Sequence, residues 1–184
     1  MAKARKAGSK KQPAKSAKHL YAIGIGSNRP LAGNMGPRRI VHAATIALDR
    51  KPLRCIARSP IIASRPIGPS QRTYANAVAL VKTALPPLAM LDALQTIEAL
   101  FGRRRYRRWG ARSLDLDLLL WSGGRMRHKR LIVPHPFLRT RSFVLGPLAA
   151  VAPAWRDPVS GLTVRQLAAR LARPKPVDPA ARSL

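Results

Sequence analysis

The chain has 184 residues, with 35 lysines and arginines against seven aspartates and glutamates, and a formal net charge of +28. This length suits a single domain, one cysteine excludes an internal disulfide, and no apolar run approaches the roughly 18 residues of a membrane helix. The basic excess favours polyanionic partners, namely nucleic acid, nucleotide phosphates or an anionic membrane surface.

The two ends of the chain are predicted to be tails around a domain of residues 19–173. Residues 1–18 hold seven lysines and arginines and no acid, so burial cannot offset their ordering entropy and we expect disorder. Such an arm either contacts a polyanion, nucleic acid included, or only aids solubility. Residues 174–184 include three prolines, which end any helix after Arg173. The N-terminus lacks the apolar segment of a secretory signal, so we expect a cytoplasmic protein with no membrane partner.

Strand and helix patterns alternate along the domain. Apolar runs bounded by turn residues predict strands, and apolar stripes spaced by three or four residues predict helices. The expected elements are a strand at Leu20–Gly26, a helix at 36–49, strands at Leu53–Ala63 and Tyr74–Thr83, a helix at Leu88–Phe101 and a strand at Ser113–Trp121, followed by a strand near Arg130–Val133 and a helix near Phe143–Val151. The order β-α-β-β-α-β of the first six elements predicts one α+β domain of the ferredoxin-like type.

Two aspartates, Asp115 and Asp117, are separated by one leucine in the last strand of this series. Residues two apart on a strand point to the same face, so both carboxylates project together while the leucines face an apolar core. Paired carboxylates repel unless a cation or a proton lies between them. Mg²⁺, which commonly takes one or two carboxylates plus substrate phosphates, is one interpretation. Solvated acids paired with surface arginines are the other.

The segment before these aspartates, residues 102–112, is rich in arginine. It holds six arginines, Tyr106 and Trp109, with glycines at 102 and 110 that would let a loop move. Guanidinium groups match phosphate oxygens, so a polyphosphate site is one interpretation. A solvated basic loop, or a nucleic-acid patch with stacking aromatics, is the alternative. Acids directly beside the arginines favour metal and polyphosphate, because carboxylates repel a nucleic-acid backbone.

An ordered series of motifs resembles the hydroxymethyldihydropterin pyrophosphokinase family of the folate pathway. The carriers of the resemblance are residues 108–119 (RWGARSLDLDLL), 21–28 (YAIGIGSN), 66–69 (PIGP), 74–77 (YANA), 95–98 (QTIE), 133–136 (VPHP) and 141–148 (RSFVLGPL). They cover about residues 20–170. One such motif is weak, whereas the whole series in the family's order is specific.

The resemblance implies transfer of pyrophosphate from ATP to 6-hydroxymethyl-7,8-dihydropterin, with release of AMP. It implies two Mg²⁺ ions held by Asp115 and Asp117, and catalytic roles for these two aspartates and for Arg103 and Arg112, which would brace the phosphates. By the same resemblance, the ATP-side residues are Gln95, Glu98, Arg130, His135 and Arg141, and the pterin-side residues are Ile67, Tyr74, Asn76, Trp109 and Phe143. The implied partners are ATP and the pterin alcohol, and we expect a monomer.

An alternative from another class is a basic RNA-binding or ribosome-associated protein on the same βαββαβ order. The aromatic-rich strand that marks an RNA-recognition motif is absent from the sequence, which disfavours its most familiar form. Three positions depart from the family pattern: Pro136 and Phe137 stand after the histidine, and the bulky Arg65 precedes Pro66. None of these departures touches the aspartate pair.

Overall fold

The structure is a computed structural model that describes residues 18–31, 35–65, 72–102 and 113–173. Its main sheet has the strand order β2-β4-β1-β5, with a short β3 that also pairs with β4, and every pairing is antiparallel. The strands are β1 (His19–Ser27), β2 (Arg54–Arg58), β3 (Ile62–Ser64), β4 (Tyr74–Thr83) and β5 (Asp115–Trp121). This order confirms the ferredoxin-like α+β prediction. The expected tails lie outside the described residues, except for Lys18.

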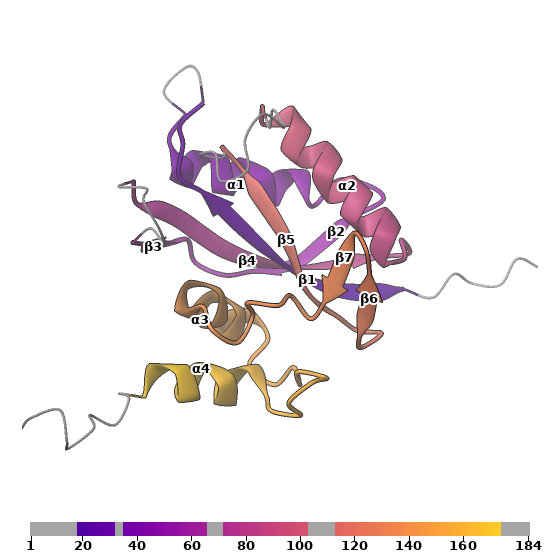
Figure 1. Cartoon of the computed structure of the whole chain (residues 1–184). Coiled ribbons are helices and arrows are strands. Elements are labelled where there is room, and N and C mark those ends of the chain that lie inside the picture. Colours follow the sequence, from indigo (N-terminus) through magenta and orange to yellow (C-terminus); the bar gives the residue numbers. More distant parts are fainter. Residues whose placement is uncertain (1–17, 32–34, 66–71, 103–112, 174–184) are drawn as a thin grey trace, which may run out of the picture.

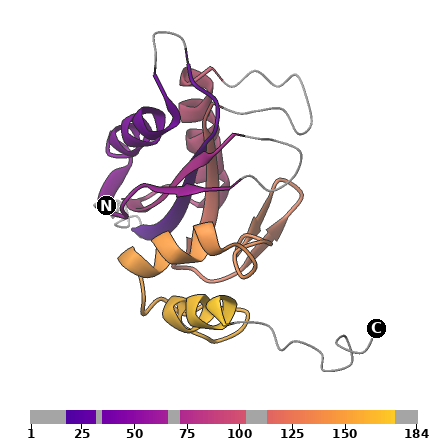
Figure 2. The ribbon, with the colours of Figure 1, turned by 90° about the vertical axis from the view of Figure 1, so that its left-hand side faces the viewer.

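Helices cover both faces of the sheet (Figures 1 and 2). The helices α1 (Pro37–Ala47) and α2 (Pro87–Leu100) lie on one face, and α3 (Ser142–Val151) and α4 (Val164–Ala172) lie on the other. Both α1 and α2 start with a proline, whose fixed φ suits the first turn and whose missing N–H costs no hydrogen bond there. None of the described helices is long and apolar enough to cross a membrane.

The period-two alternation of the strands divides the buried side chains into two cores. On β1, Tyr21, Ile23 and Ile25 pack with α1 and α2, whereas Ala22 belongs to the core beneath α3 and α4. On β5, Leu116 joins the first core, so its neighbours Asp115 and Asp117 project from the opposite face. The face of the sheet that carries the two aspartates is called the site face below.

The single strand expected at Leu53–Ala63 is two strands, β2 and β3, and that prediction is wrong in this respect. The interruption lies at Ser59 and Pro60. Ser59 still pairs with Val78, through its N–H (2.9 Å) and its hydroxyl oxygen (3.0 Å), but Pro60 has no N–H to continue the ladder. The expected strand near residue 130 is β7 (Leu131–Val133). Its partner β6 (Met126–His128) and the helix α4 were not predicted.

The chain between α3 and α4 folds around a buried carboxylate, that of Asp157, which is 0% exposed. Arg139 donates to its two oxygens from Nε and Nη2 (2.7 Å each), and Ser160 donates from its hydroxyl (2.6 Å) and its N–H (3.1 Å). The N–H of Val159 donates as well, at 3.2 Å. We call these four residues the Asp157 cluster.

The Asp157 cluster predicts a loss of stability in acid. Burial raises the pKa of Asp157, but the hydrogen bonds from Arg139, Ser160 and Val159 outweigh burial and lower it from 3.8 to about 2. The stabilising contribution is therefore complete above about pH 4 and is lost as the pH falls through about 2, with a size of about 2 kcal/mol. Urea denaturation should show that Asp157→Asn loses stability relative to wild type at pH 5, and that the gap narrows towards pH 2. A gap independent of pH would contradict this linkage.

Candidate active site

The two aspartates lie opposite two glycines of the central strand β1. In the β1–β5 register, Asp117 faces Gly24 and Asp115 faces Gly26. Both aspartates are partly exposed, and the side chain of Asp117 is 41% exposed. The side chain of Leu119 lies over Gly24, 3.3 Å from where a Cβ would stand, whereas Gly26 leaves bare backbone beside Asp115, which we call the glycine floor.

Gly26 also faces Asn76 on its other side, in the β1–β4 register. Asp115, Gly26 and Asn76 therefore form one row across β5, β1 and β4, and the two outer residues are separated by two strand spacings, about 10 Å. A Cβ on Gly26 would lie 3.5 Å from the Oδ1 of Asn76. The row thus sets a carboxylate and a carboxamide on either side of the bare backbone of Gly26, and we call this backbone the shelf.

Filling this shelf should impair the activity without disturbing the fold. In Gly26→Val, the new Cβ makes an ordinary contact of 3.5 Å with Asn76 Oδ1 and valine suits a strand, yet the side chain stands between Asp115 and Asn76. We expect kcat/KM to fall at least about tenfold, because reacting groups tolerate little misplacement. The matched control is Gly36→Ala at the start of α1, where a Cβ meets nothing within 4 Å. Unchanged kinetics in Gly26→Val would show that substrate does not use the shelf.

Asn76 is held in place by a neighbouring strand. It is 7% exposed, and its Nδ2 donates to the hydroxyl oxygen of Ser64 on β3 at 2.8 Å. That bond orients the carboxamide, whose oxygen lies toward Gly26. Tyr74 precedes Asn76 by two residues on β4 and so shares its face. Ser64 was not predicted as a site residue, and only the cross-strand register reveals it.

His135 lies beside the aspartates. Its Nε2 is 3.9 Å from an oxygen of Asp117, and its Nδ1 accepts the N–H of Phe137 at 3.2 Å. Burial lowers the pKa of His135, the charge of Arg141 lowers it further, and Asp115 partly opposes both. A neutral ring whose Nδ1 accepts a hydrogen bond carries its proton on Nε2. The side chain therefore presents one N–H donor to the site face.

Arg141 lies over the aromatic ring of Phe137. Its guanidinium carbon is 4.5 Å from the centre of that ring and 5.8 Å from the ring centre of Phe143, which is half-buried in the first turn of α3. Such cation–π contacts hold a guanidinium without neutralising it. Phe137, seen in the sequence only as a departure from the family pattern, therefore braces a cation and lies 6.0 Å from the ring of His135.

Glu98 is buried in the structure, with 1% of its surface exposed. Its Oε1 accepts the N–H of Leu116 at 2.8 Å, between the two aspartates of β5. Glu98 therefore holds the strand that carries the aspartates, and its contact with a nucleotide stays a prediction. Gln95, one turn earlier on α2, is half-buried.

The remaining predicted residues fall into two groups. Arg130, in the turn between β6 and β7, forms an exposed ion pair with Asp92 of α2, so its side chain is directed to that helix. Arg103, Arg112, Ile67 and Trp109 lie outside the described residues. The structure therefore brings together Asp115, Asp117, His135 and Arg141, with Asn76 across the shelf.

The donor set suits Mg²⁺ better than a metal held by protein ligands alone. Within the described ranges, no group of three or more His, Cys, Asp or Glu side chains could hold a metal ion. Mg²⁺ needs no such cage, because one or two carboxylates suffice when phosphate oxygens and water complete its shell. Asp115 and Asp117, both partly exposed on the site face, fit that requirement.

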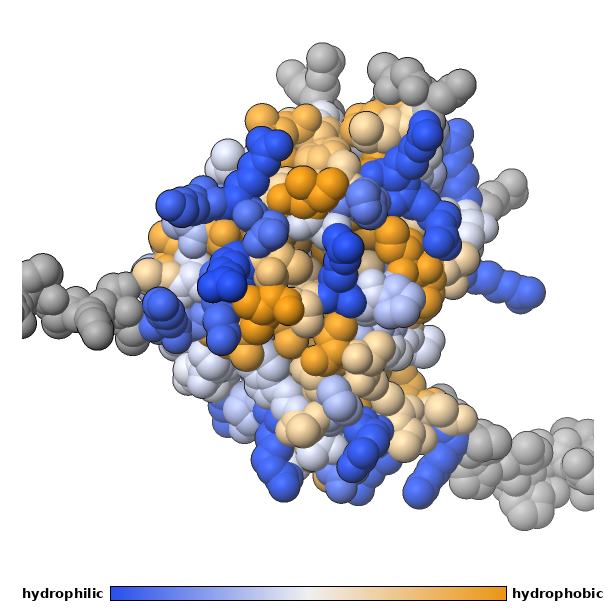
Figure 3. Space-filling view, turned by 180° about the vertical axis from the view of Figure 1, so that it is seen from behind, coloured by the Kyte–Doolittle hydropathy of each residue, from blue (hydrophilic) through white to orange (hydrophobic). Residues whose placement is uncertain are grey.

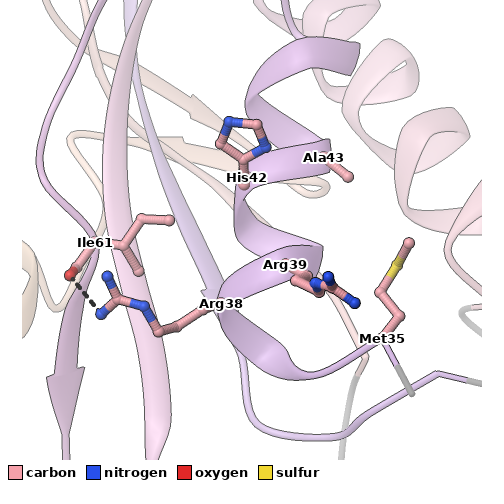
Figure 4. A pocket seen from close by; sticks show the side chains of 6 residues that line it. All are labelled: Met35, Arg38, Arg39, His42, Ala43 and Ile61. Carbon is pink, nitrogen blue, oxygen red and sulfur yellow. Dashed lines mark hydrogen bonds between the residues drawn. The ribbon is translucent and has the colours of Figure 1, made fainter.

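A pocket of about 490 Å³ lies elsewhere, beside α1 (Figure 4). It is lined by Met35, Arg38, Arg39, His42, Ala43 and Ile61, and Arg38 donates to the carbonyl of Ile61 at 3.2 Å. It contains none of the predicted site residues, and α1 covers the opposite face of the sheet. Because the carboxylates, the histidine and the carboxamide converge on the site face, that face and not this pocket is the candidate active site.

The basic excess is not confined to one described patch. On the face seen from behind, the most hydrophilic side chains are dispersed among apolar ones (Figure 3). A nucleic-acid interface normally concentrates its charge on one face or along one helix. This dispersion gives no support to the RNA-binding alternative.

Comparison with known proteins decides the family. Residues 22–153 match the family described as 7,8-dihydro-6-hydroxymethylpterin-pyrophosphokinase (HPPK). The chain belongs to this family. It is 48% identical over 124 residues to the 2-amino-4-hydroxy-6-hydroxymethyldihydropteridine pyrophosphokinase of Pseudomonas aeruginosa, a match that covers 66% of this chain and 76% of that protein. The enzyme of the same name from Synechocystis sp. is 39% identical over 150 residues, or 81% of this chain and 74% of that protein.

Solved structures agree on the fold. A crystal structure of wild-type Plasmodium falciparum HPPK-DHPS with pteroate superposes with a TM-score of 0.65 at 14% identity, over 84% of this chain and 42% of that one. This chain thus spans less than half the length of that protein. At this identity the likeness supports the fold alone, which is the one predicted from the order of elements.

Proposed function

We propose that this HPPK-family chain performs its pyrophosphate transfer on the site face, with the phosphates of ATP over Asp115 and Asp117 and the pterin towards Asn76. The observation that carries this placement is the row Asp115–Gly26–Asn76, which sets a carboxylate and a carboxamide at the two sides of one glycine floor. A carboxamide offers both a donor and an acceptor, as the edge of a pterin requires.

The chain's own residues supply positioning and charge. Two Mg²⁺ ions, held by Asp115 and Asp117 with phosphate oxygens, would neutralise charge on the phosphates. His135 offers the Nε2–H as a donor to a phosphate oxygen, and Arg141 offers a cation held by Phe137. The pterin hydroxyl forms its bond to the β-phosphorus and loses its proton to water, while the bond from that phosphorus to the oxygen shared with the α-phosphate breaks and this oxygen leaves as part of AMP.

Residues outside the described ranges complete the proposal. We assign Arg103 and Arg112 to the phosphates, and Ile67 and Trp109 to the pterin, with Trp109 and Phe143 stacking on its two faces. We also propose that the enzyme acts as a monomer in the cytoplasm, which sedimentation and cell fractionation test.

The direct test is an incubation with ATP, Mg²⁺ and the pterin alcohol. AMP should form in a one-to-one ratio with the diphosphorylated pterin, and only when all three components are present. AMP formation independent of the pterin would contradict the proposed transfer. RNA binding without any AMP would favour the alternative instead.

A further inference from the structure

The Asp157 cluster holds a turn that contributes several of the side chains proposed to bind ATP. Residues 135–141 form neither helix nor strand, yet they contribute His135, Phe137 and Arg141 to the site face. Within the turn, the N–H of Leu138 donates to the carbonyl of His135 at 3.0 Å and the N–H of Thr140 to the carbonyl of Phe137 at 3.3 Å, and these local bonds do not fix how the turn lies on the sheet. The N–H of His135 donates to the carbonyl of Leu119 at 3.0 Å, and Leu138 is fully buried beneath it. The paired contact of Arg139 with Asp157 is the third attachment.

The Arg139–Asp157 pair fixes the orientation of the Arg139 guanidinium as well as its distance from the carboxylate. Two parallel hydrogen bonds of 2.7 Å lock the plane of the Arg139 guanidinium against the carboxylate. The carboxylate in turn is fixed by three donors from Val159 and Ser160. Because Asp157 is fully buried and its partner is 30% exposed, neither side chain can rotate without leaving a buried charge unpaired.

The pair also separates two like charges. Arg139 and Arg141 are two residues apart in a chain that already carries a net charge of +28. Asp157 neutralises Arg139 and draws it towards the chain between α3 and α4, whereas Arg141 lies over Phe137 with its charge uncompensated by that contact. Of the two arginines in the turn, Arg141 is therefore the one whose charge is available to the phosphates of ATP.

We propose that Asp157 is a positioning residue of this enzyme: through Arg139 it orients the turn 135–141 so that His135 and Arg141 meet the phosphates of ATP. This inference rests on the proposed placement of ATP on the site face. Asp157 itself touches no substrate. Its loss should weaken ATP binding more than pterin binding, because Asn76 and Tyr74 are held on β4 and Phe143 is held in the helix α3, outside the turn.

The test compares Asp157→Asn with Leu167→Ala, a core substitution in α4 that destabilises the same layer but leaves the Arg139–Asp157 pair in place. Steady-state kinetics in ATP and in pterin, binding of a nonhydrolysable ATP analogue with Mg²⁺, and thermal unfolding are measured for both variants. For Asp157→Asn we expect the KM for ATP and the Kd of the analogue to rise about tenfold, with the KM for pterin within about twofold. Leu167→Ala should lower the Tm and leave both KM values unchanged.

A second variant, Arg139→Lys, keeps the positive charge but loses the two parallel guanidinium donors. It should also raise the KM for ATP and leave the KM for pterin nearly unchanged, and it tests the proposal even if Asp157→Asn does not fold. Equal changes in both KM values, or the same change in Leu167→Ala, would show that the pair only stabilises the fold. Unchanged KM values in a folded Asp157→Asn or Arg139→Lys would also overturn the positioning role. If wild type itself released no AMP, the proposed function would fail rather than this inference.

Discussion

Replacement of Asp117 by alanine is expected to reduce kcat by about a thousandfold while the protein still folds. Removing one of two carboxylates leaves too few protein ligands to fix a cation against the phosphates, and electrostatic groups of this kind contribute about 100- to 1000-fold each. The fold should survive, because the side chain of Asp117 is 41% exposed and projects away from the core that Leu116 and Leu118 join.

The matched control for this loss is Asp49→Ala, which removes an exposed carboxylate at the far end of α1. Asp49 accepts the N–H of Cys55 at 3.0 Å, so its removal affects a turn and not the site face. We expect kcat of the control within about twofold of wild type, as for surface changes away from functional groups. Stopped assays of AMP release over a Mg²⁺ series compare the two, and near-normal turnover in Asp117→Ala would refute the metal assignment.

The parts of the fold that sequence predicted are those set by local rules. The alternation on β5 places the leucines and the aspartates on opposite faces because a strand has a period of two. The helices α1 and α2 were found from apolar stripes that follow prolines. The division of 53–63 was missed because both halves have strand-like patterns, and the effect of Pro60 depends on which neighbour it meets in the sheet.

The site was predicted less completely, because several of its contacts join residues far apart in the chain. The bonds of Asn76 to Ser64 and of Arg139 to Asp157 span 12 and 18 residues, and no local pattern pairs them. Phe137 was seen only as a departure. A resemblance to a family transfers motif positions, but it does not say whether a matched residue touches substrate or holds a neighbour that does.

Glu98 illustrates this difference, although a local signal was present. It follows Leu94 by four residues and Ile97 by one, so it lies on the buried stripe of α2 and not on its polar face. A carboxylate on such a stripe needs a donor, and the free edge of a neighbouring strand offers one. Read in this way, the sequence would have predicted a buried Glu98 that contacts β5.

The burial of Glu98 leads to a prediction that distinguishes two roles for this residue, namely fixing the strand β5 and binding the nucleotide. Glu98→Ala removes the acceptor of the Leu116 N–H and leaves a buried donor without a partner, which costs about 1–3 kcal/mol. Because Leu116 lies between Asp115 and Asp117, the strand should shift locally and kcat should fall about a hundredfold. Urea denaturation and AMP-release kinetics measure the two effects.

Glu98→Gln is the matched variant, since its side-chain oxygen can still accept the N–H of Leu116 in a site of the same size. If Glu98 acts by holding β5, the glutamine variant should keep kcat and the KM for ATP within about fivefold of wild type, because a neutral acceptor preserves most of the hydrogen bond. If its charge instead met a cation or the nucleotide, glutamine would lose as much activity as alanine. Equal losses of kcat in the two variants would therefore indicate that Glu98 acts through its charge, as a nucleotide-side residue does. A loss of kcat confined to Glu98→Ala would establish Glu98 as the residue that fixes β5.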